Sequence, residues 1–294
     1  MRLLLAYLGV VLIWTTTPLG IKWSAVGASY VFAVTARMTI GLGCLLIMML
    51  VSRTPLRLDR RALASYAAVS VQLYISMLLT YWGARFIPSG WLSVIYGLSP
   101  FMTAFMAAAF LKERSLGVGK VFSYLIGVAG LAVMFSSAIE MNLEAVKGMI
   151  ALLAATFLHA ASAVWVKRIG AALPALTQTT GGLLLSLPLY FVTWQWLDNG
   201  ELPLSLPEQT QWAILYLGTI ATPIGFVLYY YVLTRLPATN VAMINLLTPV
   251  LSLLLGYFAN QEPLTIKVAA GTGMIMLALA LHSWLDWQQR DSDR

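Results

Sequence analysis

Ten long apolar stretches, separated by short polar segments, limit the fold of this chain more than any other feature. They lie at 3–21, 29–51, 62–82, 90–111, 117–138, 147–166, 175–197, 211–233, 238–259 and 264–285. Each is close to the roughly 20 residues that a helix needs to cross the hydrocarbon core of a bilayer. A helix satisfies its own backbone hydrogen bonds in lipid, and these stretches lack the short alternation typical of a transmembrane β-strand. We therefore predict an all-α integral membrane protein with ten transmembrane helices.

The low content of charged residues agrees with this prediction. Only 10% of the 294 residues are charged, against about a quarter in soluble domains. The single cysteine, Cys44, can form no intrachain disulfide. The first apolar stretch continues through Trp14 to Pro18 without a small-residue cleavage site, so we expect a retained helix and not a removed signal peptide.

The basic residues predict the orientation in the membrane. With a cytoplasmic N-terminus, 13 of the 18 Lys and Arg residues fall on the cytoplasmic side, four fall outside and Arg37 lies within a span. This asymmetry follows the positive-inside rule. An even number of spans returns the C-terminus to the cytoplasm. The net charge of +7 is spread over short loops, which argues against a nucleic-acid partner. The outer residues are Lys22, Arg85, Lys147 and Lys267.

An internal repeat divides the chain into two halves. Residues 85–113 can be laid on residues 234–262 at a constant offset of 149 positions, and Lys22 falls on Lys167 at an offset of 145. We expect one five-helix repeat over 1–138, a second over 147–285 and a cytoplasmic tail over 286–294. Because five is odd, the second half must be inverted, and inverted repeats are typical of secondary transporters. The matched pairs are Pro88 with Pro237, Ser99 with Thr248, Pro100 with Pro249, and Glu113 with Glu262.

The duplicated Pro…Ser/Thr-Pro…Glu block resembles the EamA-type members of the drug/metabolite transporter superfamily. Arg37 in the second span also matches an arginine common at that place in the family. The resemblance covers nearly the whole chain. It implies a ten-helix inverted-repeat fold, a central cavity, and export of amino acids or related small polar compounds from a bacterial inner membrane. Importers and exchangers also occur in the family, so the resemblance does not fix the substrate or the direction.

Two titratable side chains inside spans are candidates for the transport site. Arg37 can pair with a substrate carboxylate, or it can turn toward the interface and hold a helix end. His159, near the middle of the sixth span, can relay a proton or bind substrate, or it can be a neutral imidazole bonded to a neighbouring helix. Ser76, Thr80, Thr219 and Thr222 add polar edges, although such hydroxyls often only join helices.

Aromatic and amide side chains within the spans complete the predicted site. Tyrosine and tryptophan offer an apolar ring with a polar edge, which suits amphipathic solutes, and a buried amide needs a hydrogen-bond partner. The predicted substrate-binding residues are Trp14, Arg37, Gln72, Tyr74, Tyr81, Trp91, Tyr96, His159, Gln178, Tyr230, Asn240 and Asn245.

Proline and glutamate mark corresponding places in the two halves. Pro100 and Pro249 each free a carbonyl from the helix ladder, which predicts bent gating helices or merely bent packed ones. Glu113 and Glu262 lie at span ends beside basic residues, so we expect them to cap helices or to hold the adjacent short loops.

The remaining residues favour a carrier over other classes of membrane protein. No Asp or Glu lies inside a span, which argues against acid-centred cation antiport, and no phosphate-binding loop for ATP is present. We expect no catalytic residue, metal or cofactor, and a monomer or homodimer whose partners are a small solute and the bilayer. A sensor or assembly subunit and a membrane-embedded enzyme are the alternatives, and inverted halves favour alternating access over a passive channel.

Overall fold

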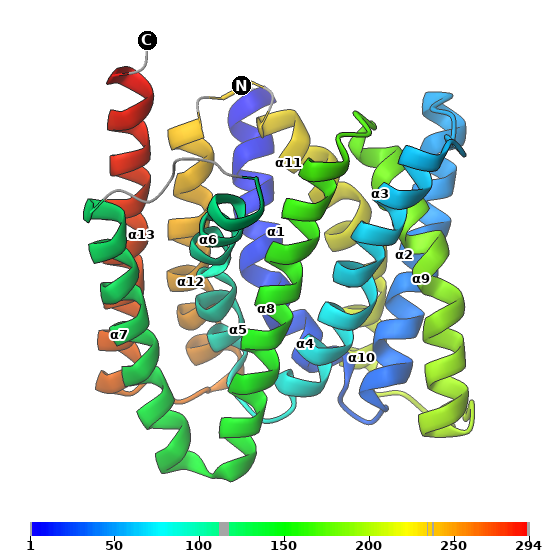
Figure 1. Ribbon diagram of the computed structural model, residues 1–294. Coiled ribbons are helices and arrows are strands. Elements are labelled where there is room, and N and C mark those ends of the chain that lie inside the picture. The colour runs from blue at the N-terminus through cyan, green and yellow to red at the C-terminus, as the bar shows by residue number, and fades with distance from the viewer. Residues whose placement is uncertain (1, 112–117, 234, 237, 293–294) are drawn as a thin grey trace.

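The computed structural model describes residues 2–292 except 112–117, 234 and 237. Only the backbone is described for 111, 118, 226, 230, 233, 238–242, 286 and 289–292. All regular elements of the described residues are helical, and they form an upright bundle in which both chain termini lie at the same end (Figure 1). The all-α prediction is therefore confirmed.

The first half of the chain forms five spans from seven α-helices and one π-helical segment. The third span is α3–η1–α4, and the fourth is broken at Gly97–Leu98 into α5 and α6. The bounds are α1 Arg2–Ser24, α2 Tyr30–Ser52, α3 Arg60–Val71, η1 Gln72–Ser76, α4 Met77–Ala84, α5 Ser89–Tyr96, α6 Ser99–Leu111 and α7 Val118–Met141.

The second half repeats this order with fewer interruptions. Its third span is α10–η2–α11, whereas its fourth, α12, is one continuous helix. The bounds are α8 Leu143–Ile169, α9 Ala175–Asp198, α10 Glu208–Tyr216, η2 Leu217–Ile224, α11 Gly225–Leu233, α12 Ala238–Asn260 and α13 Ile266–Ser292. Helix α13 thus continues seven residues past the predicted end of the last span at 285.

Nine helical segments within the described residues are long and apolar enough to span a membrane. The tenth, α9, has 24 residues but is not among the nine because it is less apolar. Many large apolar side chains face outward along the bundle, where lipid can cover them. Examples are Leu50, Val51, Phe110, Leu125, Val192 and Leu277.

Glycines bring several helix pairs close together. Helices α7 and α13 meet where a Cβ on Gly130 would lie 2.7 Å from the carbonyl oxygen of Gly271. Helices α4 and α8 meet in the same way at Gly83 and Gly148, at 2.8 Å. Such small residues permit van der Waals contact between backbones, which stabilises helix pairs in lipid.

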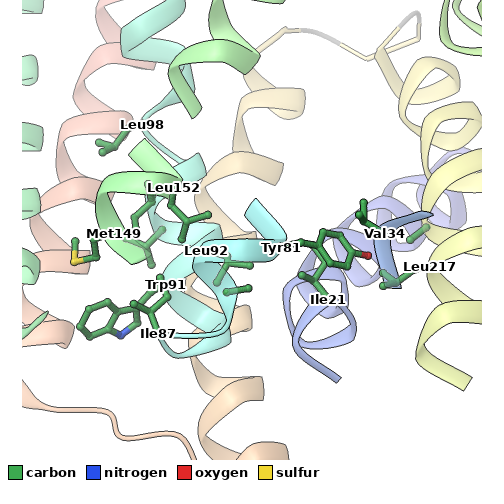
Figure 2. Packing of buried hydrophobic residues seen from close by; sticks show 14 of the residues in the cluster. Ile21, Val34, Tyr81, Ile87, Trp91, Leu92, Leu98, Met149, Leu152 and Leu217 are labelled. Atoms are coloured by element: carbon green, nitrogen blue, oxygen red, sulfur yellow. The ribbon is translucent and has the colours of Figure 1, made fainter. Parts of the chain in front are cut away.

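Apolar side chains of both halves share one core. Figure 2 shows Trp91 with Ile87 and Met149, and Tyr81 in another part of the same core with Ile21 and Val34. All six are buried. The core therefore fixes α1, α2, α4, α5 and α8 against one another.

Glu262 joins three segments at the end of the bundle opposite the termini. Its Oε2 accepts from the backbone N–H of Ser89 at 2.7 Å and from the Ser89 hydroxyl at 2.8 Å, which caps the N-terminus of α5. Its Oε1 accepts from Asn260 at 2.8 Å and lies 3.6 Å from Lys22 Nζ. The predicted capping role of Glu262 is confirmed, whereas Glu113 lies outside the described residues.

Replacing Glu262 by alanine is expected to lower the free energy of unfolding by about 3 kcal/mol, because the buried N–H of Ser89 loses its acceptor and the Lys22 ammonium loses its counter-ion. Thermal unfolding of the purified protein in detergent measures the change. Glu201→Ala, at an exposed position, is the control and should leave the melting temperature nearly unchanged. Equal melting temperatures for the two variants would contradict a stabilising role of this cap.

Candidate functional site

Arg37 lies in the interior of the bundle, where α2 meets α4 and η2. Its side chain is 5% exposed, so it does not turn toward the interface. Nε donates to Thr222 Oγ1 at 3.2 Å, and Nη1 donates to the Tyr81 hydroxyl at 3.4 Å. A guanidinium carries five N–H donors, so these two hydroxyls leave donor capacity for a further acceptor.

The π-helical segment η2 presents Thr222 to Arg37. Thr222 donates to the carbonyl oxygen of Leu217, five residues earlier, at 2.9 Å, and Pro223 lies in the same wide turn. The segment η1 of the third span is its counterpart, and its Leu73 carbonyl accepts from the Tyr190 hydroxyl at 2.5 Å. Wide turns of this kind occur frequently at functional sites.

Tyrosines from several spans gather around Arg37. The charge of Arg37 interacts electrostatically with the hydroxyls of Tyr96, Tyr190 and Tyr216. Tyr190 also contacts Tyr74, ring edge to ring face, with centroids 5.0 Å apart. These groups come from α5, α9, α10 and η1, so both halves of the chain contribute to one polar centre.

His159 adjoins this centre through Tyr96. The two rings pack edge to face with centroids 5.7 Å apart. The Tyr96 hydroxyl lies 2.6 Å from Thr80 Oγ1 and 3.2 Å from Ser76 Oγ. His159 Nδ1 is buried without a hydrogen-bond partner among the described residues, so an acceptor or donor site remains for a bound group.

Four other predicted site residues have different surroundings. Trp91 is 1% exposed in the core, and its Nε1 has no hydrogen-bond partner in the described structure. Trp14 packs on Tyr229, with ring centroids 4.9 Å apart. Gln72, at the start of η1, and Gln178, in α9, are half-buried.

The fourth spans of the two halves differ at their prolines. Pro100 is the second residue of α6, just after the break in the span, whereas Pro249 lies inside the continuous helix α12. Asn245, one turn before Pro249, is half-buried. Tyr230 and Asn240 lie in α11 and α12, and their side chains are outside the described part of the structure.

Three residues of this centre, Tyr190, Tyr216 and Thr16, were not among the predicted residues. Thr16 Oγ1 lies 2.5 Å from the Tyr216 hydroxyl and joins α1 to α10. For the two tyrosines, the sequence signal is a position far from either end of a span, because the interfacial belts that hold most membrane tyrosines lie at the ends. Thr222, considered only as a polar edge, proves to be a direct partner of Arg37.

Acidic groups lie at the ends of helices in the described part of the chain. Glu262 pairs with Lys22, and Lys267 pairs with Glu140. No group of three or more His, Cys, Asp or Glu side chains that could hold a metal ion occurs among the described residues. The polar centre therefore consists of one guanidinium, one imidazole and several hydroxyls.

A multi-pass helical bundle with such a buried polar centre has the architecture of a membrane transporter. The chain belongs to the EamA-like transporter family, whose model matches residues 1–136 and again residues 146–284. It is similar to the uncharacterized transporter YoaV of Bacillus subtilis, with 22% identity over 96% of this chain and 97% of that protein. An uncharacterized transporter of Archaeoglobus fulgidus is 28% identical over 67% of this chain and 68% of its own length.

A protein of known crystal structure has the same fold. The TM-score is 0.66 at 21% sequence identity, and the superposition covers 98% of both chains. The likeness therefore extends over nearly the whole chain.

Proposed function

We propose that this protein is a secondary transporter that exports a small polar or amphipathic metabolite, an amino acid or a related compound, across the bacterial inner membrane. The buried guanidinium of Arg37, whose hydrogen-bond partners among the described residues are hydroxyls, carries the proposal. A buried charge is unfavourable unless it is paired, and a substrate carboxylate supplies a strong partner for a guanidinium. Both termini lie in the cytoplasm in this proposal, as the basic residues indicate.

Alternating access between two inverted five-helix halves is the proposed mechanism. The contacts between helices support it, because a contact between two spans recurs between the corresponding spans when the two halves are interchanged. Helix α2 packs on η2 as α9 packs on α3, and α1 packs on α12 as α8 packs on α6. The fourth spans end at opposite ends of the bundle, α6 near the termini and α12 far from them (Figure 1). The halves can thus open in turn on a shared site.

Uptake into proteoliposomes tests the proposal. With a set of labelled amino acids and other metabolites, we expect uptake of at least one zwitterionic solute. His159→Ala and Asn245→Ala are expected to lower this uptake roughly tenfold, because each removes a polar group of the proposed site. Ser136→Ala, on a side chain of α7 that donates to Val133 of its own helix, is the control.

The same vesicles separate the possible energy sources. Equal uptake with and without a pH gradient would exclude obligatory proton coupling. Unchanged uptake in both the His159 and Asn245 variants would place the site elsewhere, and no uptake of any solute by the wild type would contradict the transport function.

A further inference from the structure

The positions of heavy atoms determine where the hydroxyl hydrogens near Tyr96 point. Thr80 Oγ1 lies 2.7 Å from the carbonyl oxygen of Ser76, and Ser76 Oγ lies 2.8 Å from that of Ala155. A carbonyl oxygen only accepts, so both side chains donate their single hydrogen to the backbone. Neither has a hydrogen left for Tyr96. The Tyr96 hydroxyl therefore donates its own, and the closer acceptor is Thr80 at 2.6 Å.

The same arrangement occurs at two more tyrosines. Thr16 donates to the helix carbonyl four residues earlier at 2.8 Å, so Tyr216 donates to Thr16. Thr193 likewise donates to the carbonyl four residues earlier at 2.8 Å, so Tyr74 donates to Thr193. Each of these tyrosine hydroxyls donates its hydrogen bond to a threonine, and its lone pairs accept from no group among the described residues.

Tyr96 and Tyr216 lie within range of the charge of Arg37, and Tyr74 packs on Tyr190, which is also within its range. Tyr74, Tyr96 and Tyr216 are all partly exposed, unlike the fully buried Tyr81 and Tyr190. The site thus offers N–H donors on the arginine and tyrosine oxygens that only accept. A solute group placed against those oxygens must bring hydrogens, because an oxygen without them would face another acceptor and lose its hydrogen bond to water.

We propose that Thr80, and with it Thr16 and Thr193, are positioning residues that fix tyrosine hydroxyls as acceptors. The site thereby selects solutes that carry N–H donors, such as a protonated primary amine, near a carboxylate, and rejects those with only acceptors there. This inference rests on the proposed transport function. It adds that the site distinguishes solutes by the N–H donors that they carry.

Competing uptake of two matched solutes tests the selection. L-leucine and its 2-oxo acid, 4-methyl-2-oxopentanoate, share the carboxylate and the side chain and differ at the α-carbon, where either an ammonium or a carbonyl oxygen meets the tyrosines, and therefore also in net charge. Wild-type proteoliposomes should favour leucine. Thr80→Val keeps the shape of the side chain but frees the Tyr96 hydroxyl to rotate and donate, and the preference for leucine should fall roughly tenfold. Thr80→Ser should restore it.

Two further variants separate this role from a structural one. Ser76 is a second acceptor at 3.2 Å, so Ser76→Ala combined with Thr80→Val should lower the preference further. In a Tyr96→Phe background, Thr80→Val should change nothing, because the hydroxyl that it orients is gone. Thr180→Val is the matched control, since Thr180 is buried and donates to Leu176, and it has no tyrosine partner among the described side chains.

The outcomes distinguish this inference from the proposed function. An unchanged preference in the double variant, with uptake retained, overturns the positioning role, as does an effect of Thr80→Val that persists without the Tyr96 hydroxyl. If the wild type takes up neither solute but takes up another, the transport function stands; if it takes up no solute at all, the transport function fails. The same two solutes are then compared by their effect on the melting temperature of the purified protein, and equal stabilisation overturns the selection.

Discussion

Replacing Arg37 by glutamine is expected to lower the uptake of a carboxylate-bearing solute at least about a hundredfold. The variant keeps a polar amide but is shorter, and it loses the charge and most of the N–H donors. A charge-assisted, bidentate contact is among the strongest that a solute can make, and Lys22 is already paired with Glu262 at the end of the bundle. Uptake into proteoliposomes of the solute found for the wild type measures the loss.

Three comparisons make the result specific for binding. Arg37→Lys keeps the charge without the planar fork and should retain only part of the activity. Arg85→Gln, at an exposed arginine that lies over Tyr30, should leave uptake nearly unchanged. The melting temperature of the Arg37→Gln protein should not fall, because the variant removes a buried charge without orphaning a carboxylate. A folded Arg37→Gln protein with normal uptake would contradict the assignment.

Replacing Gly271 by valine is expected to lower the free energy of unfolding by about 3 kcal/mol. A Cβ at this position would lie 2.8 Å from the carbonyl oxygen of Gly130 and 2.8 Å from Met134 Cγ. A backbone atom cannot move aside as a flexible side chain can, so α13 must separate from α7 along their shared face. Thermal unfolding in detergent, together with the yield of monodisperse protein, measures the loss.

The same helix provides the control. Gly273 lies two residues further along α13, and a Cβ there would meet nothing within 4 Å. Gly273→Val introduces the same side chain into the same helix and should change the melting temperature little. If both valine variants melt at the same temperature, the close approach of α7 and α13 does not stabilise the fold.

The number and approximate bounds of the spans could be predicted from the sequence because burial in lipid demands long apolar runs. The interruptions could not. The π-helical segments η1 and η2 depend on how Tyr190 and Arg37 bind groups on neighbouring helices, and a hydropathy pattern carries no information on such contacts. The sequence indicates that Tyr96 offers a polar edge. Its hydrogen bond to Thr80 could not be predicted, because that bond joins two different spans whose relative placement a hydropathy pattern does not give.

The candidate site was predicted in part for the same reason. A charged residue inside a span is so unfavourable that Arg37 stands out from the sequence alone. Trp91 and Tyr216 show the opposite difficulty, since an aromatic residue suits a closed core, an interface and a binding site equally well. Only the packing of the whole bundle places Trp91 in the core and Tyr216 near the arginine.

In the proposed carrier, the hydroxyl partners of Arg37 also determine the response to the membrane voltage. A guanidinium is a cation, and the hydrogen-bond partners of Arg37 among the described residues are hydroxyls, so no carboxylate cancels its charge. The site is then positive when empty or when it holds a zwitterion, and neutral when it holds a monovalent anion. One elementary charge that crosses 100 mV gains or loses about 2.3 kcal/mol, so the resting potential favours different orientations of the anion-loaded and the zwitterion-loaded carrier.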